Sequence, residues 1–452
     1  MRKFLPENLI KMADICQHSL YIVGGSVRDF LLGYPASLST DWDICSPAPE
    51  DNVIAAAERC GVTVASVFRN TGTVKLKDKE GAAYEFTRFR SDKYVRGLHS
   101  PAEITFTDSM EVDARRRDFC ANAVYYDIKN DAFCDPLGGM PDISAKILRT
   151  VSPAKKVFGE DGLRLMRLAR FAAELGFSPD GECLEGAKRH AALIRDIAPE
   201  RVFSELNAIL NADLKHGVKD APERGLRILS DTGVLDEIIP ELTLGRGMPQ
   251  PKAFHSYDVF EHSIRCVRYA PPEIRFAALL HDVGKPYCML RDGNYYRHPE
   301  EGARIAKEIL SRLKAPNKLI IKTQNLVALH MRDYNYLMRE SKVRRDIVEN
   351  YPLIEDLFSL KQADYSACKD DLSPAPVVGK WKNILTAMRS EGVPFSLKEL
   401  NVNGADAESL GIPREEIGKT LCKLLEECTL DGTLNTRDLL LKRLKKQAKK
   451  YT

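Results

Sequence analysis

The sequence lacks long hydrophobic runs, paired cysteines and a large excess of either charge. None of its apolar runs approaches the ~20 residues that a membrane-spanning helix needs, and the N-terminal stretch MRKFLPENLIKMAD has no signal-peptide core. The eleven cysteines are odd in number and form no CxxC pair, which disfavours disulfides and zinc knuckles. We therefore expect a cytoplasmic protein with reduced thiols and no membrane partner.

The low net charge and the lack of repeats disfavour further classes of protein, namely strongly basic nucleic-acid binders and repeat proteins. The formal net charge is only +3, so a nucleic-acid partner would have to bind to local basic patches. Low-complexity tracts and internal repeats are also missing from the sequence. With 44% hydrophobic and 29% charged residues, the 452-residue chain has the composition of a folded protein with roughly two to four domains.

The stretch 20–33 predicts a strand, a glycine turn and a helix. Apolar residues 20–23 end at Gly24 and Gly25, and residues 27–32 follow as a short helix with Ser26 placed to cap it. Glycines without side chains let a ligand approach the free amide groups at such a helix start. This pattern is typical of a phosphate seat, although a lone glycine pair is more often an ordinary turn.

Two acidic residues follow in a second predicted strand, residues 41–44. Strand side chains alternate, so Asp41 and Asp43 should point to the same face. Neighbouring carboxylates repel each other unless a cation lies between them, and their hard oxygens suit Mg²⁺. Alone, such a pair is usually surface charge. Beside a phosphate seat it is typical of a site that attacks a nucleoside triphosphate.

The rest of the first 140 residues reads as mixed α/β. We expect a helix at 50–60 and strands at 62–64, 73–76 and 84–89. The polar stretch 90–101 has no clear period and is predicted to be a loop, where moving catalytic parts often lie.

An arginine-rich segment, residues 113–123, then places three arginines before an acid and an asparagine. A guanidinium can bind phosphate oxygens through two parallel hydrogen bonds, so these residue types suit ribose and phosphate recognition. A solvated helix start is the alternative interpretation. The candidate residues are Arg116, Arg117, Asp118 and Asn122.

From about residue 145 the pattern is helical. Residues 160–171 are expected to form one helix, with Glu160, Arg164 and Arg167 on a polar stripe. On that helix Asp161 and Arg164 would be i, i+3 neighbours. An ordinary surface ion-pair ladder explains the stripe equally well.

A histidine-rich segment follows a predicted linker at 245–251. Five of the nine histidines lie between 255 and 330, and an adjacent His-Asp pair follows an apolar run. Neutral imidazoles and carboxylates together are ligands for divalent metals, whereas a single histidine is more often a packed core residue. His255 has no secure role here, and His298 and His330 are candidates only for a second metal or a substrate. The main candidates are His262, His281, Asp282 and Asp364.

Four motifs occur in the order expected of one family. GGSVRD…DWDI resembles the first motif of the class II tRNA nucleotidyltransferases and bacterial poly(A) polymerases, and RRDFCANA resembles their second, RRDFTxNA. DPLGG resembles the third, and EDGLR resembles EDxxR. The resemblance implies an α/β nucleotidyltransferase head with a small mixed sheet, then an all-α neck, an HD domain and a helical tail. The implied bounds are 1–140, 141–245, 250–370 and 371–452.

The resemblance also implies an activity, which is template-independent addition of CCA to the 3′ end of tRNA from CTP and ATP, with release of pyrophosphate. Asp41 and Asp43 would be catalytic and hold Mg²⁺, while Asp161, Arg164 and Arg167 would contact the incoming nucleotide. The helical neck and tail would hold the tRNA acceptor end. The remaining nucleotide-binding residues would be Gly24, Gly25, Arg28 and Asp29 for the triphosphate, with Arg116, Arg117, Asp118 and Asn122 for ribose and phosphate.

The string FAALLHDVGKP is similar to the HD phosphohydrolase superfamily. That similarity implies a second divalent metal, which could be Mn, Ni, Co or Mg, and a possible second activity. Its implied ligands are His262, His281, Asp282 and Asp364.

Two other functions remain open. One is a poly(A) polymerase or an A-adding tRNA nucleotidyltransferase, because the family loop RxExxYxDGRxP is only partly kept here. Arg90 and Pro101 stand at the family spacing, and Asp92 stands where the family has Glu. Tyr94 and Gly97 each come one position earlier than in the family pattern. The other is an HD metal phosphohydrolase whose head only binds RNA.

The C-terminal segment 437–450 is a predicted basic helix. Its lysines and arginines could contact an RNA backbone or could simply complement the helix dipole.

Overall fold

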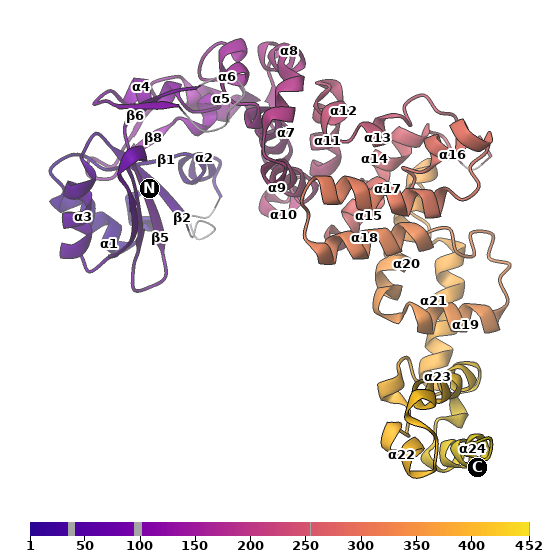
Figure 1. Cartoon of the computed structure of the whole chain (residues 1–452). Helices are drawn as coiled ribbons and strands as arrows, with labels where there is room; N and C mark the ends of the chain where they lie inside the picture. Colours follow the sequence, from indigo (N-terminus) through magenta and orange to yellow (C-terminus); the bar gives the residue numbers. More distant parts are fainter. Residues whose placement is uncertain (35–40, 95–101, 254, 452) are drawn as a thin grey trace. The chain divides into compact units, whose positions relative to one another are not determined.

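The computed structural model describes residues 1–34, 41–94, 102–253 and 255–451. The chain forms two compact units, Met1–Pro240 and Glu241–Thr452 (Figure 1). The first unit contains the segments predicted as head and neck, and the second contains those predicted as HD domain and tail. The finer four-part division stays a prediction.

A mixed seven-stranded sheet forms the centre of the first unit, in the order β3-β4-β5-β2-β1-β8-β9. Strand β2 runs parallel to β5, and the other neighbouring pairs are antiparallel. The predicted small mixed sheet is therefore confirmed. The strands are β1 (Tyr21–Val23), β2 (Asp41–Ser46), β3 (Thr63–Phe68), β4 (Thr73–Lys77), β5 (Ala83–Arg88), β8 (Tyr125–Asp127) and β9 (Ala132–Cys134).

The burial of β2 follows its alternating sequence. Trp42 and Ile44 are buried in the core, whereas Asp43 between them is exposed. Ile22 of β1 pairs with Ile44, so the end of β1 and the glycine turn after it lie beside Asp43. This pairing places the glycine turn beside the carboxylate of Asp43.

The stretch 90–101 is not simply a loop, which corrects the prediction. Residues Arg90–Lys93 form strand β6, which pairs antiparallel with β7 (Glu103–Phe106). Alternation is hard to recognise in so short and polar a strand, and hydrogen bonds to β7 supply the order instead. Gly97 and Pro101 lie outside the described residues.

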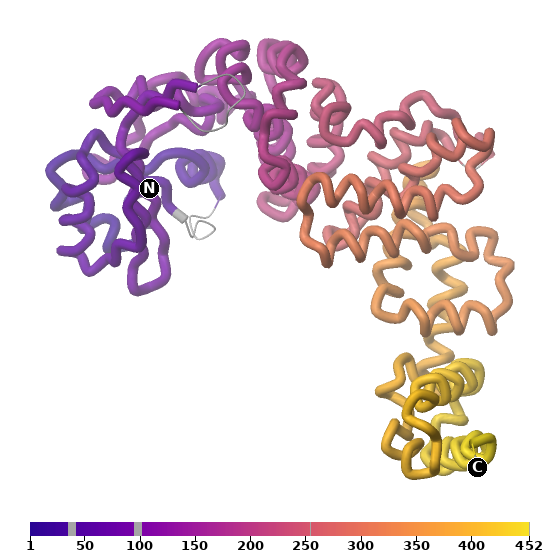
Figure 2. Tube along the Cα trace, viewed as in Figure 1, coloured from indigo at the N-terminus to yellow at the C-terminus, as the bar shows by residue number. Residues whose placement is uncertain are grey.

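Helices complete the first unit, and the trace in Figure 2 follows them from indigo to magenta. The first four helices lie in the predicted head, and the fifth crosses its predicted end at residue 140: α1 (Glu7–Ile15), α2 (Gly25–Leu31), α3 (Glu50–Arg59), α4 (Met110–Arg115) and α5 (Gly139–Ala145). The later helices lie in the predicted neck: α6 (Ala154–Glu160), α7 (Leu163–Leu175), α8 (Gly181–His190), α9 (Pro199–Leu210), α10 (Asp213–His216), α11 (Ala221–Asp231) and α12 (Val234–Ile238). Two short strands, β10 (Ile147–Leu148) and β11 (Ser178–Pro179), pair in parallel among them, so this segment is mostly helical and not all-α.

The second unit is helical throughout its described residues. The first helix, α13 (Pro240–Thr243), begins at the boundary. The others are α14 (Val259–Tyr269), α15 (Arg275–Leu280), α16 (Lys285–Asp292), α17 (His298–Arg312), α18 (Asn317–Leu329), α19 (Glu340–Glu349), α20 (Ile354–Lys369), α21 (Pro376–Ser390), α22 (Gly404–Ser409), α23 (Arg414–Leu430) and α24 (Arg437–Ala448).

The segment 245–251 packs within the second unit, although its composition predicts a linker. The amide of Gly247 donates a hydrogen bond to the Asp258 carboxylate at 2.8 Å. Lys285 donates to the side-chain oxygen of Gln250 at 2.7 Å, and Gln250 is buried. These contacts are long-range, so local composition cannot reveal them.

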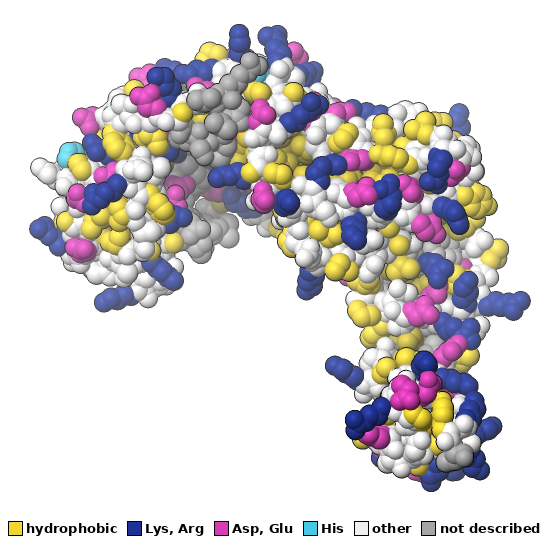
Figure 3. Space-filling view, in the orientation of Figure 1, with side chains coloured by type: hydrophobic (Ala, Val, Ile, Leu, Met, Phe, Trp, Pro, Cys, Tyr) yellow, Lys and Arg dark blue, Asp and Glu magenta, His cyan; other side chains and the backbone are white. Residues whose placement is uncertain are grey.

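The tail has a small core of its own. Leu440 and Leu444 of α24 are buried with residues of α22 and α23. The lysines of α24 point outward, and Figure 3 shows basic side chains gathered over this part of the surface. The predicted basic helix is confirmed.

No helix in the described part of the chain is long and apolar enough to cross a membrane. All eleven cysteines, each of which is described, are free.

Candidate functional site

A polar cavity of about 600 Å³ lies in the first unit between the sheet edge and the neck helices. Nearly all the predicted nucleotide-binding residues line it, although they come from four separate sequence stretches. Asp29 is not among its lining residues, and the side chain of Asp41 lies outside the described part of the chain. The predicted residues that line it are Gly24, Gly25, Arg28, Asp43, Arg116, Arg117, Asp118, Asn122, Asp161, Arg164 and Arg167.

The glycine turn is tight against the carboxylate of Asp43. Gly24 has a φ of 82°, which glycine adopts without strain, and it directly precedes α2. A Cβ built on Gly24 would lie 3.3 Å from Asp43 Oδ2. The helix-capping role predicted for Ser26 is wrong, because Ser26 lies inside α2 and Gly24 is its N-cap residue.

A chain of hydrogen bonds fixes Arg28 in the cavity wall. Its Nη1 donates to Asn122 at 2.6 Å, and its Nη2 donates to Asp29 at 2.6 Å. Asn122 in turn donates to Asp118 at 3.0 Å. Asp29 therefore orients Arg28, and its predicted contact with the triphosphate stays a prediction.

Asp118 joins this network to the neck. Arg167 of α7 donates to its carboxylate at 2.7 Å. Burial would raise the pKa of Asp118, but Arg167, Asn122 and the amide of Phe119 lower it to about 2. The ionised carboxylate thus holds one arginine of the cavity directly and Arg28 through Asn122.

Asp113 positions the two arginines of the second motif, a role that the sequence did not suggest. It is fully buried and accepts hydrogen bonds from Arg116 at 2.7 Å and from Arg117 at 3.1 Å. Burial would raise its pKa, but Arg117 and Arg116 lower it. The arginines are therefore fixed side chains and not the solvated helix start of the alternative interpretation.

Asp161 and Arg164 do not lie on one helix, which corrects the prediction. Helix α6 ends at Glu160, Asp161 is extended with φ −145°, and α7 begins at Leu163. Gly162 permits this break because a Cβ there would lie 2.6 Å from the main-chain oxygen of Leu193.

The two side chains still meet, with Arg164 Nε 4.0 Å from Asp161 Oδ2. Both are buried, so the surface ion-pair ladder of the alternative interpretation is excluded. Asp161 also accepts a hydrogen bond from the amide of Leu163 at 2.9 Å. The pair is therefore held rigidly at the start of α7.

Strand β6 and the residue that follows it bring two side chains to the cavity arginines. Asp92 Oδ2 lies 3.7 Å from Arg116 Nη1, and the Tyr94 ring lies 5.4 Å from the guanidinium carbon of Arg164. Tyr94 directly precedes the part of the family loop that is not described. Asp92 and Tyr94 are thus connected to both recognition motifs.

Six further lining residues come from α7 and from later neck helices, and the sequence motifs did not indicate them. Phe171 packs its ring against three arginines, with Arg28 at 5.2 Å and Arg167 at 5.0 Å. Their only sequence signal was the amphipathic helical pattern, which does not single them out. The missed residues are Leu163, Phe171, Arg201, Ser204, Glu205 and Lys215.

A second site lies in the other unit. His262 Nε2 is 2.9 Å from Asp364 Oδ1 and 3.2 Å from His281 Nε2, and His281 Nε2 is 3.2 Å from Asp282 Oδ2. These four residues, here called the HD cluster, come from α14, the turn after α15, and α20. The structure brings together all four of the predicted ligands.

Asp282 faces two groups of histidines. Its Oδ2 faces the HD cluster, while its Oδ1 lies 3.3 Å from His298 Nε2 and 3.6 Å from His330 Nε2. All three residues are buried. Asp282 Oδ1 has no hydrogen-bond partner among the described residues, although it is buried. A carboxylate placed in this way is suited to metal binding from either oxygen.

Three family models match consecutive parts of the chain. They describe a poly A polymerase head domain at 20–149, a probable RNA and SrmB-binding site of polymerase A at 176–244, and an HD domain at 254–364. The A-adding tRNA nucleotidyltransferase of Deinococcus radiodurans is 32% identical over 368 residues, which cover 77% of this chain and 76% of that protein. The chain belongs to the tRNA nucleotidyltransferase and poly(A) polymerase family.

Other relatives in the family support the same assignment. The multifunctional CCA protein of Azoarcus sp. is 31% identical over 341 residues, which cover 72% of this chain and 76% of that protein. A structure of the Bacillus stearothermophilus CCA-adding enzyme in complex with CTP covers 99% of both chains, with a TM-score of 0.67 and 24% identity. Because the sequence identity is only 24%, this structural likeness shows a shared fold and nothing finer.

Family membership implies dependence on divalent metal in both units, and the donor chemistry fits. Asp43 contributes a hard carboxylate to a cavity that is otherwise rich in cations. The HD cluster contributes two imidazoles and two carboxylates, and each imidazole lies within 3.7 Å of both carboxylates.

Proposed function

We propose that the first unit adds CCA to the 3′ end of tRNA from CTP and ATP. The observation that carries this proposal is the cavity in which the Asp43 carboxylate faces a wall of arginines. Its volume of about 600 Å³ is in the range of small-ligand sites. The curated relatives named above, one CCA protein and one A-adding nucleotidyltransferase, support this substrate class.

The arginines serve to bind and orient the triphosphate. Arg28, Arg116 and Arg117 are held by carboxylates and by Asn122, so their positions are set before the nucleotide arrives. The glycine turn leaves room for phosphate oxygens beside Asp43. Mg²⁺ held by Asp41 and Asp43 would activate the RNA 3′-hydroxyl and neutralise the pyrophosphate as it leaves.

Base selection is assigned to Asp161 and Arg164. A carboxylate only accepts hydrogen bonds and a guanidinium only donates them at neutral pH. Cytosine and adenine each present an amino donor beside a ring-nitrogen acceptor, whereas uracil and guanine present the reverse order. The buried pair therefore matches C and A and disfavours U and G.

The neck and tail would hold the tRNA by shape and backbone charge. The model for a probable RNA-binding site covers 176–244, and α24 presents several exposed lysines. Such contacts recognise an RNA helix without reading its sequence.

The decisive experiment supplies a tRNA that ends before CCA and offers each nucleoside triphosphate in turn. CTP alone should extend it by two residues, and CTP with ATP should extend it by three. An enzyme that adds only A would extend only a tRNA already ending in CC. That second function is favoured by the A-adding relative and by the partial match of the loop after Arg90.

We further propose that the second unit is a metal-dependent phosphohydrolase. The observation behind this proposal is the HD cluster, with Asp282 facing two further histidines. The cluster and those histidines could hold two divalent ions that share Asp282. Metal analysis of the protein after incubation with Mn²⁺, Ni²⁺, Co²⁺ or Mg²⁺ tests this proposal, because an ion-free protein in every case would contradict it.

A further inference from the structure

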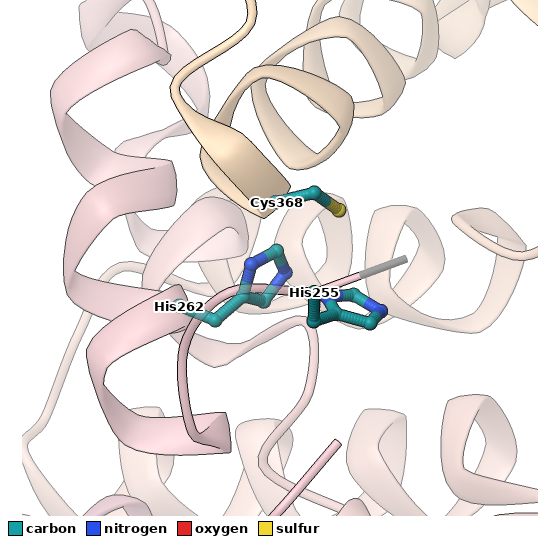
Figure 4. A group of neighbouring side chains, drawn as sticks. All are labelled: His255, His262 and Cys368. Carbon is teal, nitrogen blue, oxygen red and sulfur yellow. The ribbon is translucent and has the colours of Figure 1, made fainter. Parts of the chain in front are cut away.

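A third group of metal-ligating atoms lies beside the HD cluster. His255, His262 and Cys368 each contribute an atom, and these three atoms lie within 4.8 Å of one another (Figure 4). The group, here called the thiol set, combines two imidazoles with one thiol. It shares His262 with the HD cluster and is otherwise unused by the proposed phosphohydrolase.

Helix α20 places Cys368 beside the HD cluster. Cys368 follows Asp364 by four residues, so both side chains lie on the same face of the helix. Both residues also line a cavity of about 450 Å³, together with His255 and Asp282. A dissolved ion can therefore reach the thiol and the HD cluster from the same opening.

The segment that carries His255 is tied to the end of α20. The amide of Ser256 donates to the main-chain oxygen of Cys368 at 2.9 Å, and Lys369 Nζ donates to the oxygen of Ala253 at 2.8 Å. The amide of His255 donates a hydrogen bond to the main-chain oxygen of Pro251 at 3.1 Å. These bonds hold the imidazole of His255 close to the thiol without any metal.

Asp370 adds a second anchor just past α20. Its carboxylate accepts hydrogen bonds from Tyr257 and Tyr269 at 2.6 Å each, and from Arg265 at 2.8 Å. The start of α14, which carries His262, is thereby fixed against the end of α20, which carries Cys368. The thiol set is thus held by several independent contacts.

The imidazoles retain unused capacity to bind an ion. His262 is fully buried, and neither its Nδ1 nor that of His255 has a hydrogen-bond partner among the residues that the structure describes. The two rings lie edge to face with centroids 5.0 Å apart. Sulfur and nitrogen donors favour Zn²⁺ or Co²⁺, whereas the carboxylate-rich HD cluster also accepts the harder Mn²⁺.

We propose that the thiol set is a thiophilic metal site that competes with the HD cluster for His262. An ion bound there would form a bond to the Cys368 sulfur and release the thiol proton to water. A neutral imidazole has one free nitrogen lone pair, so an ion on the Nδ1 of His262 would leave the proton on Nε2, which lies 2.9 Å from Asp364. His262 could then no longer be a ligand of the HD cluster. Zn²⁺ would therefore inhibit the second unit. The existence of a metal site at the thiol set does not depend on the proposed role of the HD cluster. Only the competition between the two sites rests on that role.

Co²⁺ titration of the full-length protein tests the site itself. A cobalt–thiolate bond gives a charge-transfer absorption in the near ultraviolet that imidazole and carboxylate ligands do not give. We expect this band in the wild type and in Cys422→Ser, which removes an exposed thiol of α23. It should be lost in Cys368→Ser, and His255→Ala should weaken cobalt binding by about tenfold or more. An unchanged band in Cys368→Ser would overturn the proposal.

Displacement of Mn²⁺ tests the competition. Zn²⁺ added to the Mn²⁺-loaded protein should release Mn²⁺, seen by electron paramagnetic resonance, at a concentration about tenfold lower for the wild type than for Cys368→Ser. Equal release from both proteins would overturn the competition. A wild type that binds no Mn²⁺ would contradict the proposed HD metal site, while the cobalt band would still decide the thiol set.

Discussion

Arg164 donates from its Nη2 to the main-chain oxygen of Arg116 at 2.7 Å, which joins the start of α7 to the second motif of the head. Arg164 also donates to the main-chain oxygen of Val157 at 3.1 Å. Its guanidinium is therefore oriented by two backbone groups, with Asp161 4.0 Å away. The residues assigned to the base and those assigned to the phosphates are thus parts of one connected structure.

Replacement of Asp43 by alanine should abolish nucleotide transfer. We expect kcat to fall by at least about a hundredfold, because the residue holds metal for the chemical step, while tRNA binding stays near the wild-type value. The same result is predicted for Asp41→Ala. The control is Asp51→Ala, which breaks an exposed ion pair with Arg69 at 2.8 Å and should be silent. Near wild-type turnover of Asp43→Ala would refute the site assignment.

Gly24→Ala should slow nucleotide transfer, and the variant Gly33→Ala separates the effect of the new Cβ contact from that of backbone strain. The new Cβ would lie 3.3 Å from Asp43 Oδ2, and a φ of 82° is strained for alanine. Gly33→Ala also puts alanine at a positive φ, of 83°, but its Cβ meets nothing within 4 Å. Both variants should lose about 1–2 kcal/mol of stability, and only Gly24→Ala should lose activity. Equal activity of the two would show that the turn does not act through Asp43.

The stabilisation from Asp118 should depend on pH. Its folded-state pKa is about 2, below the ordinary ~3.9, so its contribution is present above about pH 4 and is lost as pH falls toward 2. At neutral pH the free energy of unfolding of the wild type should be about 2–3 kcal/mol larger than that of Asp118→Asn. Urea unfolding at several pH values measures this difference. A difference that grows on acidification would contradict the assigned ion pair with Arg167.

The sequence was sufficient to predict strands β1 to β5 and the motif residues of the cavity. Strong alternation identified β2, and residue chemistry identified the arginines of the second motif, because charge and polarity are properties of single positions. What it could not predict were features set by distant contacts. The break at Gly162 depends on the oxygen of Leu193, and the role of Asp113 depends on side chains that fold back onto it.

The β6–β7 hairpin and the neck residues of the cavity were missed for the same reason. Arg201 and Lys215 lie on helices whose pattern shows only which face is buried. No local signal indicates that they will line the same cavity as Asp43. In the second unit the ligand residues were predictable because a His-Asp pair is rare, whereas the partnership of His255 with Cys368 became visible only in the folded chain.

The double variant His281→Ala, Asp282→Ala should lose divalent metal and any phosphatase activity of the second unit. CCA addition should survive, because the transfer cavity lies entirely in the first unit. Since both residues are buried, circular dichroism must show that the variant folds. Asp364→Asn, a milder change at a more exposed ligand, should weaken metal binding about tenfold or more. Retained metal in the double variant would refute the HD cluster.

The final prediction concerns how bases are chosen without a nucleic-acid template. Asp161→Ala would also remove the hydrogen bond to the amide of Leu163, so Asp161→Asn is the sharper variant. Asparagine keeps an acceptor for that amide but adds a donor that no longer suits the amino groups of C and A.

We expect Asp161→Asn to slow incorporation of CTP and ATP and to narrow their advantage over UTP and GTP. An unpaired polar group at a buried site costs roughly 1–3 kcal/mol, so the loss of selectivity should be about tenfold to a hundredfold. The measurement is kcat/KM for each of the four nucleotides on the same tRNA. Asp51→Asn is the matched control, because Asp51 pairs with exposed Arg69 at 2.8 Å and neither residue lines the cavity. Unchanged selectivity in Asp161→Asn, with transfer intact, would exclude Asp161 from base recognition and leave it as a residue that only orders the start of α7.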